Sequence, residues 1–176
     1  MIAQSITEAG FGTPFSSFGT GLLIAILLRY PEIGSISCNQ EEQVLNIKFP
    51  VKGPYPFDGL RETLLDAWAV FNQIERRSVK VCRIERTTQE VEILVLTRDL
   101  ATLTFAEMNL SVQIIKAALG KQLIIEEPVL GEEDRIFQED MIIQSLAAMR
   151  SRGAENSLTA LREEGRVLVF GASGRL

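Results

Sequence analysis

The chain has 176 residues, of which 46% are hydrophobic, and this combination excludes a largely disordered protein because it allows a sizeable core. Its formal net charge of −5 argues against nucleic acid and anionic membranes as partners, since their phosphate groups would be repelled. The sequence contains no histidine, which excludes the imidazole-based nucleophile pairs of hydrolases and the commonest metal ligand.

Two further features bear on redox state and location. The two cysteines, Cys38 and Cys82, each lie in an apolar run without a C-x-x-C pair, so we expect free thiols that pack as small hydrophobes. The apolar run at residues 22–28 is far shorter than the ~20 residues that a bilayer span needs, so no membrane partner is expected. Residues 1–10 lack the basic start of a secretory signal, and a cytoplasmic location is therefore predicted.

Residues 1–19 are predicted to form a loop rich in glycine and phenylalanine. Its glycines could let the backbone approach a ligand closely, and the candidate ligand-binding residues are Gly10, Gly12 and Gly19. Its phenylalanines have to be buried somewhere, and the candidate subunit-interface residues are Phe11, Phe15 and Phe18. The alternative is a loop that packs on its own domain through these rings.

The next segments predict a helix followed by a hairpin. A helix over residues 20–29 ends where Tyr30 precedes Pro31, because the residue before proline avoids the α-helical region. This helix is apolar on every side, so we expect it to be buried on most faces. Alternating apolar residues then predict strands at 35–39 and 43–50 that form a hairpin.

The same order of elements follows a second time. Asp58 is predicted to cap an amphipathic helix that runs to Ile74. A second hairpin is predicted from strands at 79–86 and 90–98, with its turn near Thr87. The repetition indicates either a duplicated αββ unit or reuse of a common pattern.

A third helix carries the most complete local signals in the chain. Thr104 and Glu107 form an S/T-x-x-E capping box at its start, in which each side chain can bind the other residue's amide. Gly120 stands where a residue in the left-handed conformation would end the helix. Apolar residues 123–125 then predict one more strand.

Two fold plans fit these elements, and both are α+β two-layer sandwiches with an antiparallel sheet. One is the αββ repeat, and the other is a ferredoxin-like βαββαβ core that begins with the strand at 43–50. In the ferredoxin-like plan that first strand has no free edge. The strands at 35–39 and 122–126 therefore compete to pair with it, and the sequence leaves this choice open.

The composition changes after residue 130, so we predict a core domain over 1–130 and a C-terminal helical arm over 131–176. The arm is expected to contain a charged helix at 132–152, a shorter helix at 157–164 and a final strand at 167–170. Because the preceding sheet already looks complete, we expect the arm to pack on another subunit. Its candidate interface residues are Ile142, Leu146 and Met149.

The end of the sequence reads RVLVFGASGRL, a hydrophobic strand followed by G-A-S-G. This pattern resembles the opening fingerprint of Rossmann-type dinucleotide-binding enzymes, in which the glycines matching Gly171 and Gly174 let the backbone approach a pyrophosphate. That chemistry also needs a following helix and a ribose-binding acid, and neither follows Gly174 in this sequence. We therefore predict no cofactor.

Five cations lie close together in an otherwise acidic chain, namely Arg76, Arg77, Lys80, Arg83 and Arg86. The simpler interpretation is a solvated face that pairs with nearby acids. The alternative is a site in which Arg83 and Arg86 bind an anionic ligand. The acids at 126–134 lack the spacing of a calcium loop, so no metal site is predicted.

No motif in the sequence identifies a reaction, and the lack of histidine favours a role without catalysis. We expect a non-catalytic binding or assembly module that forms a homo-oligomer, most simply a dimer, or binds a protein partner, because apolar surface remains outside the core elements. The alternative is a small enzyme, or a small-molecule or anion-binding domain that uses the glycine-rich loop and the arginine cluster.

Overall fold

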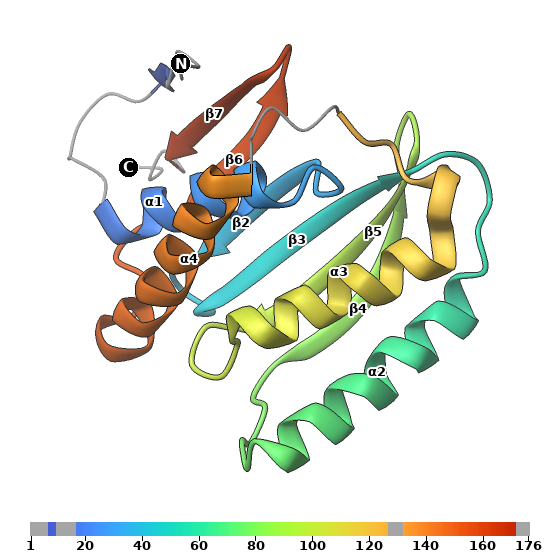
Figure 1. Ribbon diagram of the computed structural model, residues 1–176, viewed down its shortest axis with the longest axis horizontal. Coiled ribbons are helices and arrows are strands. Elements are labelled where there is room, and N and C mark those ends of the chain that lie inside the picture. Colours follow the sequence, from blue (N-terminus) through green and yellow to red (C-terminus); the bar gives the residue numbers. More distant parts are fainter. Residues whose placement is uncertain (1–6, 10–16, 127–131, 172–176) are drawn as a thin grey trace.

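The structure is a computed structural model that describes residues 7–9, 17–126 and 132–171 (Figure 1). Its strands are β1 (Thr7–Ala9), β2 (Ser35–Asn39), β3 (Val44–Val51), β4 (Cys82–Thr88), β5 (Glu92–Asp99), β6 (Leu158–Glu163) and β7 (Arg166–Gly171). Its helices are α1 (Ser17–Arg29), α2 (Phe57–Ile74), α3 (Phe105–Leu119), the 3-10 turn η1 (Gly120–Gln122) and α4 (Glu132–Arg152). None of the described helices has the length and apolar character that crossing a membrane requires.

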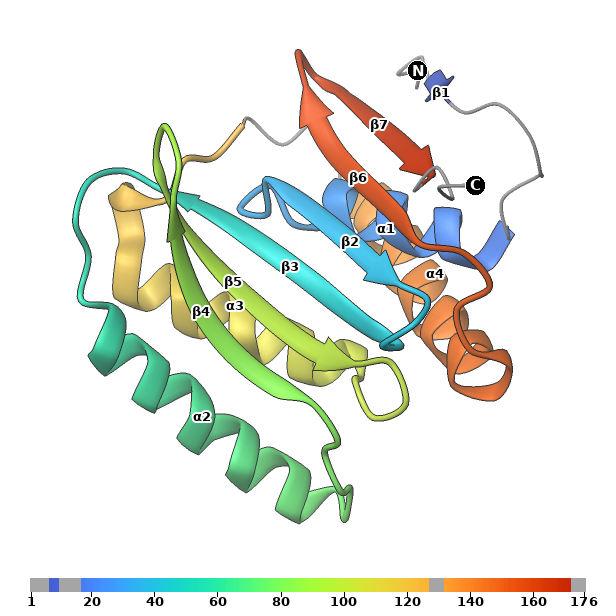
Figure 2. The ribbon, with the colours of Figure 1, turned by 180° about the vertical axis from the view of Figure 1, so that it is seen from behind.

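The described strands form one seven-stranded sheet in the order β1-β7-β6-β2-β3-β5-β4. All neighbours are antiparallel except β1 and β7, which are parallel. The α-helices lie together on one face of the sheet, and the view from behind shows the strands in front of them (Figures 1 and 2). The predicted α+β class with an antiparallel sheet is therefore confirmed.

The ferredoxin-like strand order is not confirmed. Strand β3 lies between β2 and β5, so that Ile47 faces Ile36 on one side and Leu96 on the other. Residues 123–125, which were predicted to form a strand that competes with residues 35–39 for β3, contribute only an isolated bridge from Leu123 to Val51. The short connection between β2 and β3 explains this choice, because a hairpin neighbour costs less chain entropy than a distant strand.

Helix α1 is buried on most of its surface, as its uniform apolar character predicts. Leu22, Leu23, Ile26 and Leu27 are all 0% exposed, and the helix packs between the sheet and α4. A Cβ at Gly19 would lie 3.1 Å from Leu158 Cδ1 on β6. Glycine at this position therefore lets α1 approach the sheet closely.

Several element ends in the second αββ unit differ from the prediction, and the start of α2 and the turn of the hairpin are two examples. Pro56 occupies the N-cap of α2 without a side-chain bond, and Asp58 lies in the first turn, where its charge complements the helix dipole. The second hairpin turns between Thr88 and Glu92 rather than near Thr87. Both differences shift an element end by a few residues and leave its type unchanged.

The predicted short helix at 157–164 was wrong, because these residues form strand β6. Glu164 and Gly165 both have positive φ angles, 49° and 75°, which suit the tight turn that joins β6 to β7. Leu158 and Ala160 point into the core and pair with β2. Their pairing and burial outweigh the helix propensity of a segment rich in leucine, alanine, arginine and glutamate.

Helix α4 has the predicted bounds, and its apolar stripe packs inside the chain. Ile142, Leu146 and Met149 are 0%, 1% and 4% exposed and belong to the same core as α1 and β6. These three interface candidates therefore face the chain's own core instead of another subunit. Residues 132–171 share one sheet and one core with residues 17–126.

Candidate functional site

A buried network of charged and polar side chains lies where α2 and α3 cover β5. The Arg98 side chain is 1% exposed and binds the Glu107 carboxylate through two bonds, Nε to Oε2 at 2.7 Å and Nη2 to Oε1 at 2.8 Å. Its Nη1 donates to Asp99 Oδ1 at 2.5 Å, and its guanidinium lies 5.8 Å from the centre of the Trp68 ring. Such bidentate pairing compensates the cost of burying the charge.

Only the Thr104 half of the predicted capping box forms, and the Glu107 half does not. Thr104 Oγ1 accepts from the Glu107 amide at 3.2 Å, so Thr104 caps α3 as expected. The Glu107 carboxylate turns away from the helix start to bind Arg98 and Asn72 Nδ2, the latter at 2.6 Å. A buried guanidinium outcompetes a backbone amide because its bonds to carboxylate are charge-assisted.

Asp99 fixes the chain just before β4. Its Oδ1 accepts from the amides of Lys80 and Val81, at 3.2 and 3.0 Å, and its Oδ2 accepts from Thr102 Oγ1 at 2.7 Å. Burial alone would raise the pKa of Asp99, but the bonds from Thr102 and Val81 and the charge of Arg98 outweigh it. The pKa of this carboxyl therefore lies below its usual value.

This shift predicts a specific loss of stability in acid. A carboxyl whose pKa is lowered by folding contributes stability above its unfolded pKa, near ~4, and loses that contribution as pH falls through the folded pKa. We expect Asp99→Asn to make the urea midpoint depend less steeply on pH below about pH 4 than in the wild type. Asp66→Asn, at an exposed position of α2, is the matched control. An unchanged slope in Asp99→Asn would contradict the prediction.

Asn72 carries an unpaired acceptor at the edge of this network. Its Nδ2 donates to Trp68 O at 2.8 Å and to Glu107 Oε1, and a carboxylate can only accept, so the orientation of the amide group is fixed. Asn72 is 4% exposed, and its Oδ1 has no hydrogen-bond partner among the described residues. Buried acceptors are almost always paired, so this oxygen is suited to a donor from a bound group.

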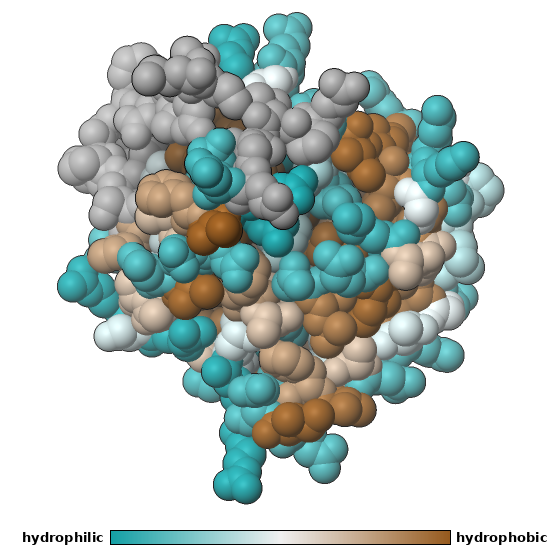
Figure 3. Space-filling view, viewed as in Figure 1, coloured by the Kyte–Doolittle hydropathy of each residue, from teal (hydrophilic) through white to brown (hydrophobic). Residues whose placement is uncertain are grey.

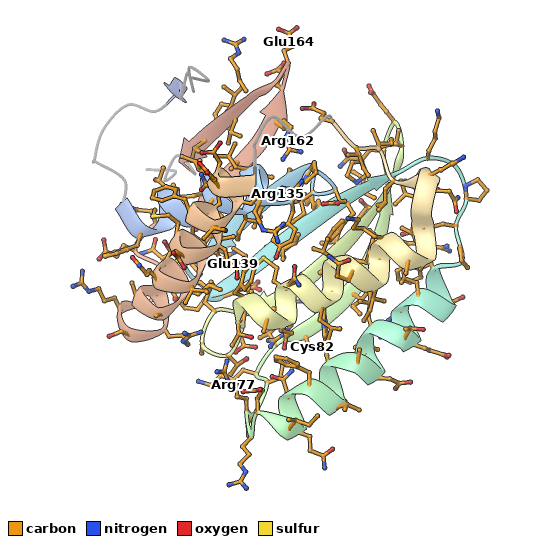
Figure 4. The ribbon with its side chains drawn as sticks, in the orientation of Figure 1. Arg77, Cys82, Arg135, Glu139, Arg162 and Glu164 are labelled. Carbon is orange, nitrogen blue, oxygen red and sulfur yellow. The ribbon has the colours of Figure 1, made fainter. Side chains whose placement is uncertain are left out.

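An open groove of about 370 Å³ runs beside Asn72, between α2 and the start of β4. It is lined by Leu65, Trp68, Ala69, Asn72, Gln73, Arg77, Val79 and Cys82. Figure 4 shows Arg77 and Cys82 at the same end of the molecule, where α2 ends. The groove is in the size range of ligand sites and joins an apolar wall to a few polar groups.

Strand β4 forms one edge of the sheet, and no described strand pairs with its outer side. Val81 O accepts from the Asp99 amide on the side of β5, whereas Ile84 O accepts a long bond of 3.4 Å from Arg61 Nε. Because backbone groups alternate between the two sides of a strand, Cys82, Ile84 and Arg86 direct their amides outward. In Figures 1 and 2, α2 lies just outside this edge.

Of the residues predicted for a ligand site, the three that the structure describes are not brought together. Gly10 and Gly12 lie outside the described residues, and Gly19 serves the packing of α1 on β6. Arg83 and Arg86 lie on β4, separated from β6 by three strands. Arg83 pairs with Glu42 at 3.1 Å between half-exposed side chains, and Arg86 lies 5.3 Å from the ring of Phe57.

The predicted aromatic interface is described only at Phe18. This residue is 39% exposed, and the Arg152 guanidinium lies 5.5 Å from its ring centre. Phe11 and Phe15 lie outside the described residues. On the helix face, Figure 3 shows hydrophobic surface over α2 and α3 and smaller patches over α4. Over the described residues as a whole, the large hydrophobic side chains that are exposed include Val70, Ile74, Ile124, Ile125, Ile136, Phe137 and Ile143.

Both cysteines are free thiols, as expected. Cys38 is buried, and burial raises its pKa to about 11, so it is inert at neutral pH. Cys82 is half-buried in the groove wall, and burial also raises its pKa. Within the described ranges, no cluster of three or more histidine, cysteine, aspartate or glutamate residues could hold a metal ion.

Arg98, Asn72 and Trp68 were not predicted as site residues. One signal was present, because Leu94, Leu96 and Arg98 alternate and so share the inward face of β5. A cation on a buried face requires a buried acid as its partner, and this requirement would have suggested Glu107 as a candidate.

We compared the chain with protein-family models, curated proteins and solved structures, and none of the three comparisons found a match.

Proposed function

We propose that the protein is a non-catalytic binding module that receives an extended segment of a partner protein along the outer edge of β4, beneath α2. The observation that carries the proposal is the groove beside a strand edge that no described strand pairs with. Outward amides recur at every second residue of β4, and an added strand is the structure that satisfies them at this spacing. Cations at 76–86 favour a partner segment with acidic character.

The groove supplies the remaining contacts for such a segment. Leu65, Trp68 and Ala69 give an apolar wall for one or two side chains. Asn72 also lines the groove, and a ligand amide that reaches its Oδ1 would pair an acceptor that has no partner among the described residues. Pockets for alternate side chains give specificity to strand addition, while main-chain bonds give affinity.

A displayed library of random peptides with free C-termini would supply the probe. We expect enriched peptides to bind the wild type and to bind Ala69→Arg at least about 30-fold more weakly, which corresponds to about 2 kcal/mol. Ala69 is exposed and lines the groove, so the arginine fills it without disturbing the core. The matched control is Val70→Arg, at an exposed position outside the groove lining.

Amide hydrogen exchange followed by NMR tests the binding mode directly. We expect bound peptide to slow exchange at Cys82, Ile84 and Arg86, while Arg83 and Glu85, whose amides face β5, change little. The proposal is overturned if the library yields no peptide that distinguishes Ala69→Arg from Val70→Arg. It is also overturned if protection falls on another part of the chain.

The homo-oligomer predicted from the sequence stays a prediction. Light scattering at micromolar concentration separates a chain mass of 19.6 kDa from a multiple of it. Peptide addition and self-association are independent properties, so a monomeric mass would contradict the oligomer without affecting the groove.

A further inference from the structure

Arg77 lies at the end of the groove next to the start of β4, and a second arginine, Arg150, lies near it. Arg77 lines the groove, and its Nη1 donates to Thr102 O at 3.2 Å. Arg150, from the last turn of α4, donates through its Nη1 to Leu103 O at 3.0 Å. The two guanidinium groups thus hold consecutive carbonyls of one loop and lie near each other. Burial and the charge of Arg77 both lower the pKa of Arg150.

This pair carries an uncompensated positive charge. Neither Arg77 nor Arg150 forms an ion pair with any residue in the described parts of the chain. The buried acids Asp99 and Glu107 are already bound by Arg98. Each arginine uses one nitrogen for its carbonyl, so donors remain for a planar anion.

The direction of a docked strand decides which end of it reaches these arginines. The strands nearest to β4, namely β5 and β3, pair in antiparallel fashion, and antiparallel pairing is slightly more stable per residue. A strand antiparallel to β4 would end beside Cys82, where β4 begins. The Arg77 side of the groove lies at that end.

We propose that Arg77, supported by Arg150, binds the C-terminal carboxylate of the peptide strand that docks on β4. This inference rests on the proposed function and adds a specific requirement, namely a free chain end on the partner. Carboxylate and guanidinium match in shape and charge, so two parallel bonds can form. The site therefore recognises the end of a chain, and the apolar wall of α2 contacts the side chains that precede this end.

The test compares three versions of one enriched peptide by fluorescence anisotropy. They carry a free C-terminal carboxylate, a C-terminal amide, or a C-terminal amide with glutamate as the last residue. We expect the amide to bind the wild type about tenfold more weakly than the carboxylate, a difference of about 1.4 kcal/mol. Recovery by the glutamate version would show that a side-chain carboxylate replaces the chain end and would overturn the C-terminal assignment.

Substitutions assign the effect to the two arginines. We expect Arg77→Gln to weaken the carboxylate peptide about tenfold and to leave the amide peptide unchanged. Arg150→Gln should act in the same direction with a smaller effect. Arg77→Lys should lose only part of the affinity, because lysine keeps the positive charge but lacks the paired donors of a guanidinium group. Arg76→Gln, an adjacent exposed cation, is the control.

The outcomes separate this inference from the proposed function. Equal binding of the carboxylate and amide peptides overturns the carboxylate site, while sensitivity to Ala69→Arg would still support strand addition. Equal weakening of both peptides by Arg77→Gln also overturns it, since a structural role of Arg77 has no reason to distinguish them. If Ala69→Arg and Val70→Arg bind every peptide with the same affinity, both proposals are overturned.

Discussion

Replacing Glu107 by alanine is expected to lower the free energy of unfolding by about 3–5 kcal/mol, the cost of leaving one partner of a buried ion pair uncompensated. Glu107 is 0% exposed and accepts two bonds from Arg98 and one from Asn72. Its removal strips the Arg98 guanidinium of two bonds in a place that water does not reach. Urea denaturation followed by circular dichroism measures the change.

Two comparisons make this result specific. Glu62→Ala removes the same side chain from an exposed position of α2 and should change stability by less than about 0.5 kcal/mol. The double variant Arg98→Met with Glu107→Ala should be destabilised by less than the sum of the single variants, because Arg98 is then no longer left buried without its main partner. A loss below about 1 kcal/mol in Glu107→Ala would contradict the structure of this network.

The second large effect is expected at Arg162, where alanine should lower the free energy of unfolding by about 2–3 kcal/mol. The Arg162 guanidinium donates to the carbonyls of Leu27, Tyr30, Pro31 and Ile33, where α1 ends and turns toward β2. These carbonyls have no further helical turn to bind them, so a side chain from β6 performs that role. Without it, the carbonyls of Leu27, Pro31 and Ile33 lose this donor, whereas the Tyr30 carbonyl still accepts from the Ile33 amide at 3.1 Å.

The β6–β7 hairpin offers its own control for this prediction. Arg166→Ala removes an exposed cation that reaches Glu164 only at 3.9 Å, and it should have little effect on stability. Arg162→Lys should recover only part of the loss, because an ammonium group cannot span several carbonyls as a guanidinium does. If Arg162→Ala unfolds at the same urea concentration as the wild type, the side chain does not cap α1.

The groove could be predicted only in part from the sequence. Arg77 was noted within the basic cluster, and the amphipathic helix that carries Trp68 and Asn72 was predicted. What could not be predicted is that α2 and the start of β4 enclose a groove. That depends on how α2 packs beside β4, which is the outermost of the described strands at its end of the sheet.

The sequence by itself determined the features that depend on neighbours within a few residues. Thr104 starts α3 and Gly120, with φ 51°, ends it, because capping bonds and left-handed turns are local. The bounds of α4 and the two strands of the first hairpin were predicted for the same reason, whereas the partner of β3 was left open. Local signals are sufficient where the stabilising contacts lie within one turn or one hairpin.

Only the tertiary structure decided the features that depend on distant partners. Residues 158–163 have helix-forming side chains, yet they form β6 because β2 offers an edge that is far away in sequence. Glu107 binds Arg98 instead of capping α3 because folding brings a buried cation within reach. Strand pairing and buried charge pairing gain their free energy from contacts between remote segments, and a local pattern carries no information about where those segments will lie.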